Sequence, residues 1–245
     1  MSSSKYEKFD RYELKYYLHN SEFKNILGYL FEFMELDKFC SEFEDNHYHV
    51  NSLYFENHNY YCYRQKFDGL PERRKFRARF YSDNPSQIYL EVKKKKNFFT
   101  EKDRIKINSH NGIFKKLAVD PSCLKKNVAV DYQKKSEFFY FLHLLSLKPF
   151  LWVSYKRLAL IGKFNKGIRI TFDRNVSGAK CDVRKFNRNN LAPISLSLFY
   201  SKIIMEIKFR KIMPYWLETF IKEMNIGHRS ISKYALVFEN TIGEI

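Results

Sequence analysis

Hydrophobic and polar residues alternate with a period of two along several stretches of the chain. Residues 73–81 place Arg77 and Arg79 on one side and Phe76 and Phe80 on the other. Because successive side chains of a strand point to opposite faces, this pattern predicts a strand with one basic and one apolar face. The same alternation occurs in residues 11–18, 87–95, 167–173 and 203–210. Shorter strands are predicted at residues 50–56, 102–107 and 152–159.

Four other segments have the hydrophobic spacing of helices. They are residues 22–36, which Ser21 would cap, the Phe-rich and Leu-rich residues 134–147, residues 214–226, which Gly227 would end, and more weakly residues 111–118. About eight strands with mostly local connections favour an antiparallel sheet. With no linker or repeat in the sequence, we expect one α+β domain over residues 1–245.

The composition excludes several classes of protein. Aromatic residues make up 18% of the 245 residues, which excludes a disordered chain. No stretch approaches the roughly 20 apolar residues of a membrane helix, and the first residues have no secretory signal. Cys40, Cys62, Cys123 and Cys181 are scattered without zinc-ligand spacing, so we expect reduced thiols and a cytoplasmic location. The net charge of +17 indicates a polyanionic partner: nucleic acid, anionic lipid or a phosphate-rich molecule.

The positions of the charges distinguish these partners. On a single strand, a basic face is best explained as a solvated surface, but here five strands share the pattern. If eight strands closed into a barrel, these faces would line its lumen. Cations so close together would repel one another unless a polyanion lay between them. The alternation therefore predicts a phosphate-binding lumen.

Eight short strings resemble a known family. They are RYELKY (11–16), SLYFEN (52–57), FDGLPERRKFRARFY (67–81), YLEVKKK (89–95), SYKRLA (154–159), RITFD (169–173), MEIKF (205–209) and SKY (232–234). In this order they resemble VTC domains, which belong to the CYTH or triphosphate tunnel metalloenzyme superfamily. The resemblance runs from about Arg11 to Tyr234. It implies an eight-stranded antiparallel tunnel with a basic lumen, which polymerises inorganic polyphosphate from ATP with the help of Mn²⁺ or Mg²⁺.

The resemblance also assigns roles to residues. Those expected to act in catalysis and phosphate binding are Lys15, Arg77, Arg79, Lys93, Arg157, Arg169 and Lys233. Lys102, Arg104 and Ser232 are expected to add phosphate contacts, and Glu206 is expected to bind the metal. One departure concerns the first strand, where many CYTH phosphatases have an ExExK string and this chain has Arg11 in place of the first glutamate. That departure favours a transferase over a hydrolase.

Several alternatives stay open. Without the resemblance, Glu206 is better explained as an ion-pair partner of Lys208 or an arginine, and Glu13 and Glu91 could be ion-pair partners or lie near the metal. A non-catalytic polyphosphate-binding or nucleotide-binding module and a tripolyphosphatase are both compatible with the strings. Nucleic acid is the least favoured partner, because the cations alternate on strands and no nucleic-acid-binding motif is present. Without a membrane-inserting stretch, any export channel would be a separate protein.

Overall fold

The computed structural model describes residues 11–81, 86–96, 99–108, 136–181, 202–210 and 212–243. The predicted helix at 111–118 and Cys123 lie outside these ranges. The strands are β1 (Arg11–His19), β2 (Met34–Leu36), β3 (Tyr48–Glu56), β4 (Glu72–Phe80), β5 (Gln87–Lys96), β6 (Phe99–Asn108), β7 (Lys148–Gly162), β8 (Arg169–Lys180) and β9 (Lys202–Arg210). The helices are α1 (Asn20–Phe33), α2 (Tyr61–Phe67), α5 (Glu137–Leu144), α6 (Tyr215–Met224) and α7 (Lys233–Ile242), with a 3₁₀ turn at Cys40–Glu42.

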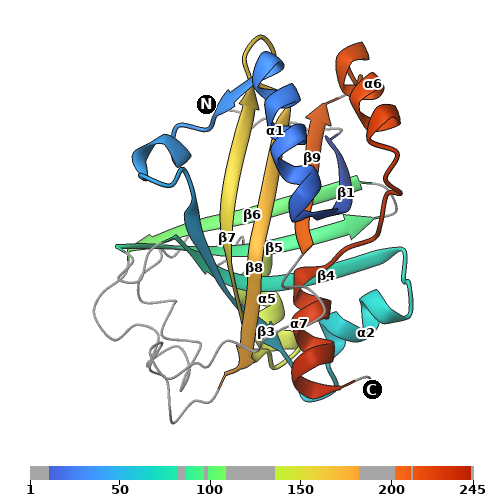
Figure 1. The fold of residues 1–245 in the computed structure, drawn as a ribbon. Helices are drawn as coiled ribbons and strands as arrows, with labels where there is room; N and C mark the ends of the chain where they lie inside the picture. The colour runs from blue at the N-terminus through green and yellow to red at the C-terminus, as the bar shows by residue number, and fades with distance from the viewer. Residues whose placement is uncertain are drawn as a thin grey trace, which may run out of the picture.

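One antiparallel sheet contains all these strands. Eight of them follow the order β1-β9-β8-β7-β3-β4-β5-β6, and β2 pairs with β7 outside this path. In Figure 1, β7 and β8 run steeply while β4, β5 and β6 cross them, so the sheet is strongly curved. The predicted α+β class, the antiparallel sheet and the flanking helices are confirmed.

The sheet does not close into a complete barrel, which differs from the sequence expectation. In the described ranges, β1 and β6 stand at the two ends of the hydrogen-bonded path. The segment before α7 takes up the outer edge of β1 instead. The backbone N–H of Arg229 donates to the Lys15 carbonyl at 2.9 Å, and Lys15 Nζ donates to the Ile231 carbonyl at 3.0 Å. This edge of β1 is thus hydrogen-bonded to a connecting segment and not to β6, which would be its neighbour in a closed barrel.

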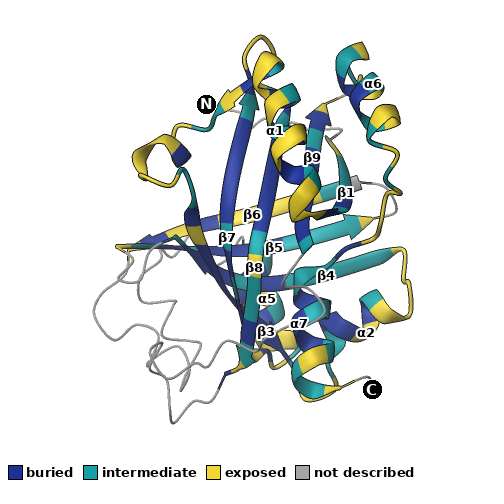
Figure 2. Cartoon of the chain, viewed as in Figure 1, coloured by how far each residue is buried: buried dark blue, intermediate teal, exposed yellow. Residues whose placement is uncertain are grey.

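The apolar strand faces form two cores, as the alternation predicts. Under β4 and β5, Phe76 and Leu90 pack with Phe138 of α5. Under β8 and β9, a second core includes Phe172 and Ile207, and α1 and α6 cover it. Figure 2 shows buried stretches in β8 and β9 and half-buried ones over much of β4 and β5. Burial of these aromatic and aliphatic side chains supplies the main driving force for folding.

Several element boundaries differ from the sequence expectation. Ser21 lies inside α1 and is not its cap, because the helix already begins at Asn20 and Glu22 Oε2 accepts from the His19 N–H at 2.7 Å. The helix also ends early, since residues 34–36 form β2 against β7. Asn225, in the left-handed region with φ 46°, ends α6 before Gly227. The helices α2 and α7 were not predicted from the sequence.

Helix α7 packs on the other side of the sheet from the two cores. Its residues Tyr234, Val237 and Phe238 join a third cluster that contains Tyr54 of β3 and Tyr155 of β7. Ser232 caps the helix by accepting the Ala235 N–H. The first turn of α7 therefore lies beside the strand faces that carry the predicted cations.

Cys40 and Cys62 are free thiols, and these two cysteines and Cys181 are buried. Among the described residues, no helix is long and apolar enough to span a membrane.

Candidate functional site

Strand pairing places the predicted cations on one face of the sheet, which we call the polar face. Arg77 lies opposite Glu91, and Glu91 lies opposite Arg104, while Lys15 lies opposite Glu206. Side chains at directly opposed positions point to the same side of a sheet. By this register, the polar face carries Glu13, Lys15, Lys75, Arg77, Arg79, Glu91, Lys93, Lys102, Arg104, Arg157, Arg169, Asp173, Glu206 and Lys208.

The curvature of the sheet brings distant parts of this face together. Lys93 Nζ on β5 lies 3.0 Å from Glu13 Oε2 on β1, although these strands are near opposite ends of the strand order. From the start of α7, Lys233 Nζ reaches Asp173 Oδ2 on β8 at 2.6 Å. All seven residues expected to act in catalysis therefore belong to one continuous surface.

Glu91 is the centre of the first charge cluster. Its carboxylate is fully buried and accepts from Arg77 Nε at 2.8 Å and from Arg104 Nε at 2.8 Å, and Lys102 forms a further ion pair with it. Burial acts to raise the pKa of Glu91, but Arg77 and Arg79 outweigh it and hold the pKa well below its ordinary value. One carboxylate therefore holds several cations in place without cancelling their charge.

Asp173 is the centre of the second cluster. Arg157 donates from Nε and NH2 to the two carboxylate oxygens at 2.6 and 2.8 Å, and Lys233 pairs with Oδ2. Asp173 is fully buried, yet its pKa is lowered because Arg157 and Lys233 outweigh the cost of burial. This bidentate contact fixes the plane of the Arg157 guanidinium.

Arg169 lies at the edge of the same face. It pairs with Asp37 at 3.0 Å and donates to the Tyr48 hydroxyl at 3.3 Å. Its partners therefore differ from those of Arg157, and it is the more exposed of the two arginines.

Glu206 and Glu13 form a carboxylate pair among lysines. Glu206, whose side chain is 7% exposed, lies 3.2 Å from Lys208 Nζ and 3.7 Å from Lys15 Nζ. Burial opposes ionisation of Glu206, but Lys208 and Lys15 keep its pKa well below the ordinary value. The pKa of Glu13 is also lowered, since Lys93 and Lys15 outweigh burial and the nearby Glu206.

These two carboxylates suit a hard divalent cation. Mg²⁺ and similar ions take oxygen ligands, and they are commonly held by one or two carboxylates together with substrate phosphates. The described residues contain no group of three or more His, Cys, Asp or Glu placed to hold a metal. The residues present thus fit an ion that shares its coordination with a phosphate ligand.

Ser232 and Lys75 meet at the entry to α7. Lys75 Nζ donates to Ser232 Oγ at 2.6 Å, and the same oxygen accepts the Ala235 N–H at 3.2 Å. Ser232 is therefore both a helix cap and a lysine partner, and its hydroxyl hydrogen is its means of contacting a phosphate. Burial, together with Lys15 and Lys93, lowers the pKa of Lys75 to about 7.

Lys75, Lys208 and Asp173 were not among the site residues expected from the sequence. The strand alternation already puts each of them on a polar face, so the period-two pattern was sufficient to find them. The family strings alone did not single them out. For Glu91 and Glu13, which had two open interpretations, the structure shows ion pairs with cations on this face.

A comparison with protein families gives one match. The family model described as the VTC domain matches residues 10–239. No curated protein matches the chain.

Solved structures give similarities in fold. A Hippeastrum protein, described as an adenylyl cyclase candidate with a dominant triphosphatase activity, has a TM-score of 0.50 and 14% sequence identity. The similarity covers 95% of this chain and 96% of that one. A Pyrococcus horikoshii protein has a TM-score of 0.47 and 17% identity, covering 94% of this chain and 98% of that one. At such identities the Hippeastrum similarity concerns the fold alone.

Proposed function

Because the chain belongs to the VTC domain family, we propose that it is a polyphosphate polymerase, which transfers the γ-phosphate of ATP to a growing inorganic polyphosphate chain. The observation that carries the proposal is the polar face, where buried Glu91 and Asp173 each hold an arginine beside further cations. Such a surface is suited to a ligand with closely spaced negative charges. ATP and polyphosphate both have this property.

The chemistry requires charge neutralisation more than proton transfer. In an in-line transfer, the terminal oxygen of the polyphosphate attacks the γ-phosphorus, and the bond to the ADP oxygen breaks. The attacking oxygen is already an anion, so no general base is needed. Two polyanions must nevertheless approach to bonding distance, and the negative charge of the transferring group must be stabilised.

The two kinds of cation have different tasks in this proposal. Arg77, Arg79 and Arg157 have planar guanidinium groups that suit two-point contacts with phosphate oxygens. Their carboxylate partners hold them in place before the substrate arrives, which lowers the reorganisation needed during transfer. Lys15, Lys93 and Lys233 act as point charges along the chain of phosphates. Lys102, Arg104 and Arg169 extend the binding surface.

Glu206 and Glu13 would hold Mn²⁺ or Mg²⁺. Such an ion supplies positive charge to the phosphate oxygens of the bound triphosphate. The two carboxylates stay ionised because of the surrounding lysines, as their lowered pKa values indicate. Ionised oxygens are the form that a metal requires.

A tripolyphosphatase is the second candidate function. The structurally similar Hippeastrum protein is described as having a dominant triphosphatase activity, which supports this alternative through the shared fold. Arg11 at the start of β1, where many hydrolases of the superfamily have a glutamate, favours the transferase. A binding module without turnover would use the same cations.

Analysis of the reaction products distinguishes the three. The purified chain is incubated with ATP and Mn²⁺, and the products are separated on a polyacrylamide gel stained for polyphosphate. A ladder of polyphosphate with a matching amount of ADP supports the polymerase. Orthophosphate without a ladder would make the protein a hydrolase, and binding of polyphosphate without any product would make it a binding module.

A further inference from the structure

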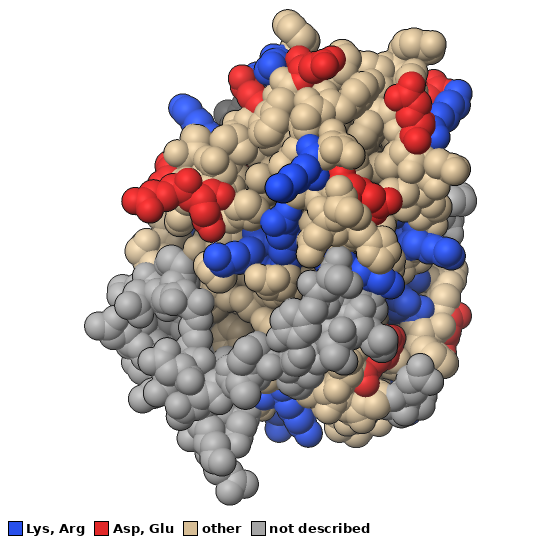
Figure 3. All heavy atoms as spheres, in the orientation of Figure 1, with Lys and Arg blue, Asp and Glu red and all other residues tan. Residues whose placement is uncertain are grey.

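A second set of basic residues lines a cavity on the opposite side of the sheet from the polar face. Lys156 and Arg174 are the sequence neighbours of Arg157 and Asp173, so their side chains leave β7 and β8 on the other face. The cavity measures about 280 Å³, and Asp45, His47, Asn20 and Asn175 also line it. Lys and Arg side chains gather across the middle of this face of the molecule in Figure 3.

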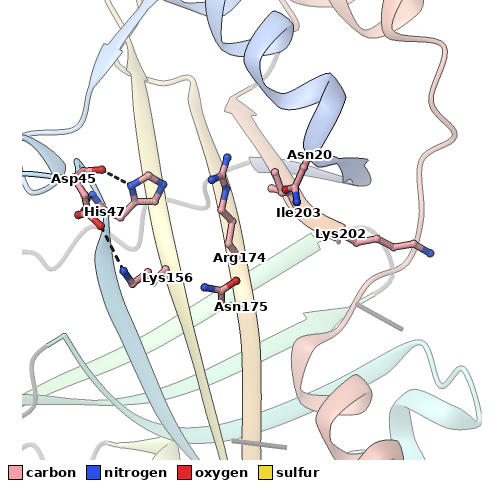
Figure 4. A pocket seen from close by; sticks show the side chains of 8 residues that line it. All are labelled: Asn20, Asp45, His47, Lys156, Arg174, Asn175, Lys202 and Ile203. Atoms are coloured by element: carbon pink, nitrogen blue, oxygen red, sulfur yellow. Dashed lines mark hydrogen bonds and ion pairs between the residues drawn. The ribbon is translucent and has the colours of Figure 1, made fainter. Parts of the chain in front are cut away.

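Among the described residues, Arg174 has no matching anion. Its guanidinium lies over the Phe23 ring, 3.7 Å from the ring centroid. Within the described ranges its Nε is buried without a hydrogen-bond partner, and no Asp or Glu there forms an ion pair with it. Most buried donors in proteins are hydrogen-bonded, so an unpaired guanidinium nitrogen beside a cavity points to a missing acceptor. In Figure 4 this guanidinium stands between His47 and Asn20.

His47 and Lys156 add donors on the other side of the cavity. The Nδ1 atom of His47 hydrogen-bonds to the Asp45 carbonyl, while its Nε2 atom is buried without a partner. In the imidazolium form, Nε2 can donate to an anion. Lys156 has one long contact to Asp45, at 3.5 Å, and its side chain is 40% exposed. Both residues can thus turn a donor toward a ligand without breaking a buried ion pair.

We propose that this cavity is a phosphate-binding site, separate from the polar face, in which Arg174, Lys156 and His47 bind a phosphate group. Its volume is slightly below the roughly 300–1,000 Å³ of pockets for drug-sized ligands. It therefore suits orthophosphate or a few residues of polyphosphate better than a whole nucleotide. The sheet separates this site from the polar face, because Lys156 and Arg174 leave β7 and β8 on the opposite side from Arg157 and Asp173.

Binding stoichiometry tests the proposal without ATP and without turnover. Equilibrium dialysis of the whole chain is performed with labelled orthophosphate and, in a second arm, with labelled tripolyphosphate. The double variant Arg77→Ala/Arg79→Ala weakens binding at the polar face but leaves its lysines and Arg157 in place, so the cavity is identified by the effect of cavity substitutions on the remaining binding. In this background we expect at least one of the two ligands to bind. We expect the further change Arg174→Gln to weaken that binding about tenfold or more, because charged hydrogen bonds contribute strongly to anion binding.

Two further variants keep the test decisive. Lys156→Gln removes a half-exposed charge and should fold normally, and we expect it to weaken the same binding event. Lys148→Gln, an exposed lysine at the start of the same strand, makes the same charge change away from the cavity and should have no effect. Binding of orthophosphate would identify a site for the free ion, and binding of tripolyphosphate alone a site for the polymer. If Arg174→Gln and Lys156→Gln leave the binding of both ligands unchanged, the proposal is wrong.

Discussion

Lys93 on β5 pairs with Glu13 on β1 at 3.0 Å, across the concave side of the curved sheet. The two strands share no hydrogen bonds and stand near opposite ends of the strand order. This pair therefore shows how far the sheet curls, even though its edges are not joined. It also links the carboxylates proposed to hold the metal with the cations proposed to bind phosphate. A phosphate ligand would compete with Glu13 for Lys93.

Arg77 is expected to be essential for ATP turnover. Replacement by alanine removes a guanidinium that contacts Glu91 and the Tyr54 hydroxyl. We expect Arg77→Ala to lower kcat/KM for ATP by about a hundredfold or more, because loss of one stabilising donor in a buried site has an effect of this order. Arg64→Ala, at an exposed arginine of α2, is the matched control. Full activity in Arg77→Ala would remove this residue from the proposed site.

Glu206→Gln separates metal binding from phosphate binding. The change keeps the size of the side chain but removes a charge that pairs with Lys208 and Lys15. We expect polyphosphate to bind at least as tightly, because the cations lose a competing anion, and we expect turnover at a fixed Mn²⁺ concentration to fall by about a hundredfold. Titration of activity with Mn²⁺ and a separate polyphosphate-binding assay check the two effects. Glu218→Gln on α6, which is half exposed, serves as the control.

Asp173 is predicted to matter for stability. It is fully buried between Arg157 and Lys233, and Asp173→Asn would leave two cations with less compensation. Breaking a buried pair in this way costs about 3–5 kcal/mol, measured as the free energy of unfolding in urea. The exposed pair of Glu35 and Lys166 gives the comparison, since Glu35→Gln should cost less than about 1 kcal/mol. Equal effects of the two changes would contradict the central role of Asp173.

The same residue gives a pH dependence of stability. The pKa of Asp173 is lower in the folded protein than in the unfolded chain. The stabilisation of the folded protein by ionised Asp173 is therefore fully present above its pKa in the unfolded chain, about 4. This stabilisation is lost as the pH falls toward the lower pKa of Asp173 in the folded protein. Thermal unfolding measured between pH 6 and pH 3 should show a smaller loss of stability in Asp173→Asn than in the original protein. A parallel loss in both proteins would show that other groups cause the acid sensitivity.

Lys75 makes polyanion binding depend on pH near neutrality. Burial and the nearby Lys15 and Lys93 lower its pKa to about 7, so it is protonated below that pH and neutral above it. A bound polyanion favours the charged form, and affinity for polyphosphate should thus fall as the pH rises from 6 to 7.5. One proton allows a change of up to about tenfold per pH unit.

Lys75→Gln should bind polyphosphate more weakly at pH 6 and with a flatter pH profile. Burial lowers the pKa of Lys208 to about 8 and that of Lys102 to about 6, so the slopes are compared around pH 7, between these two values. Lys94→Gln, on the opposite face of β5, is the control because it removes an equal charge away from the polar face. An unchanged slope in Lys75→Gln would assign the pH dependence to another group.

The sequence was most informative where one face of a strand is apolar. The alternation in residues 73–81 correctly predicts that Phe76 and Phe80 are buried and that Arg77 and Arg79 share a face. Opposed pairs such as Arg77 and Glu91 could not be predicted, because pairing register depends on tertiary contacts. Helix α7 was also missed, since its apolar residues pack on the polar side of the sheet around Tyr155.

The sequence failed at two other points for physical reasons. Residues 34–36 continue a helical pattern, but their backbone gains hydrogen bonds by pairing with the edge of β7. The outer edge of β1 is covered by a backbone contact between Arg229 and Lys15, which are far apart in the sequence, so no local pattern indicates it. The alternation predicted the polar-face cations, and the family strings singled out many of them but not Lys75 or Lys208. Only the structure shows that Glu91 and Asp173 organise them.

The fate of the γ-phosphate tests the central claim most directly. The chain is incubated with ATP labelled in the γ-phosphate and Mn²⁺, and the label is divided into polyphosphate, orthophosphate and remaining ATP over a time course. If the protein is a polyphosphate polymerase, most of the released label enters polyphosphate chains that lengthen with time, and one ADP is formed for each phosphate added. Label that appears only as orthophosphate from the first time points, with no polymer formed, would contradict it.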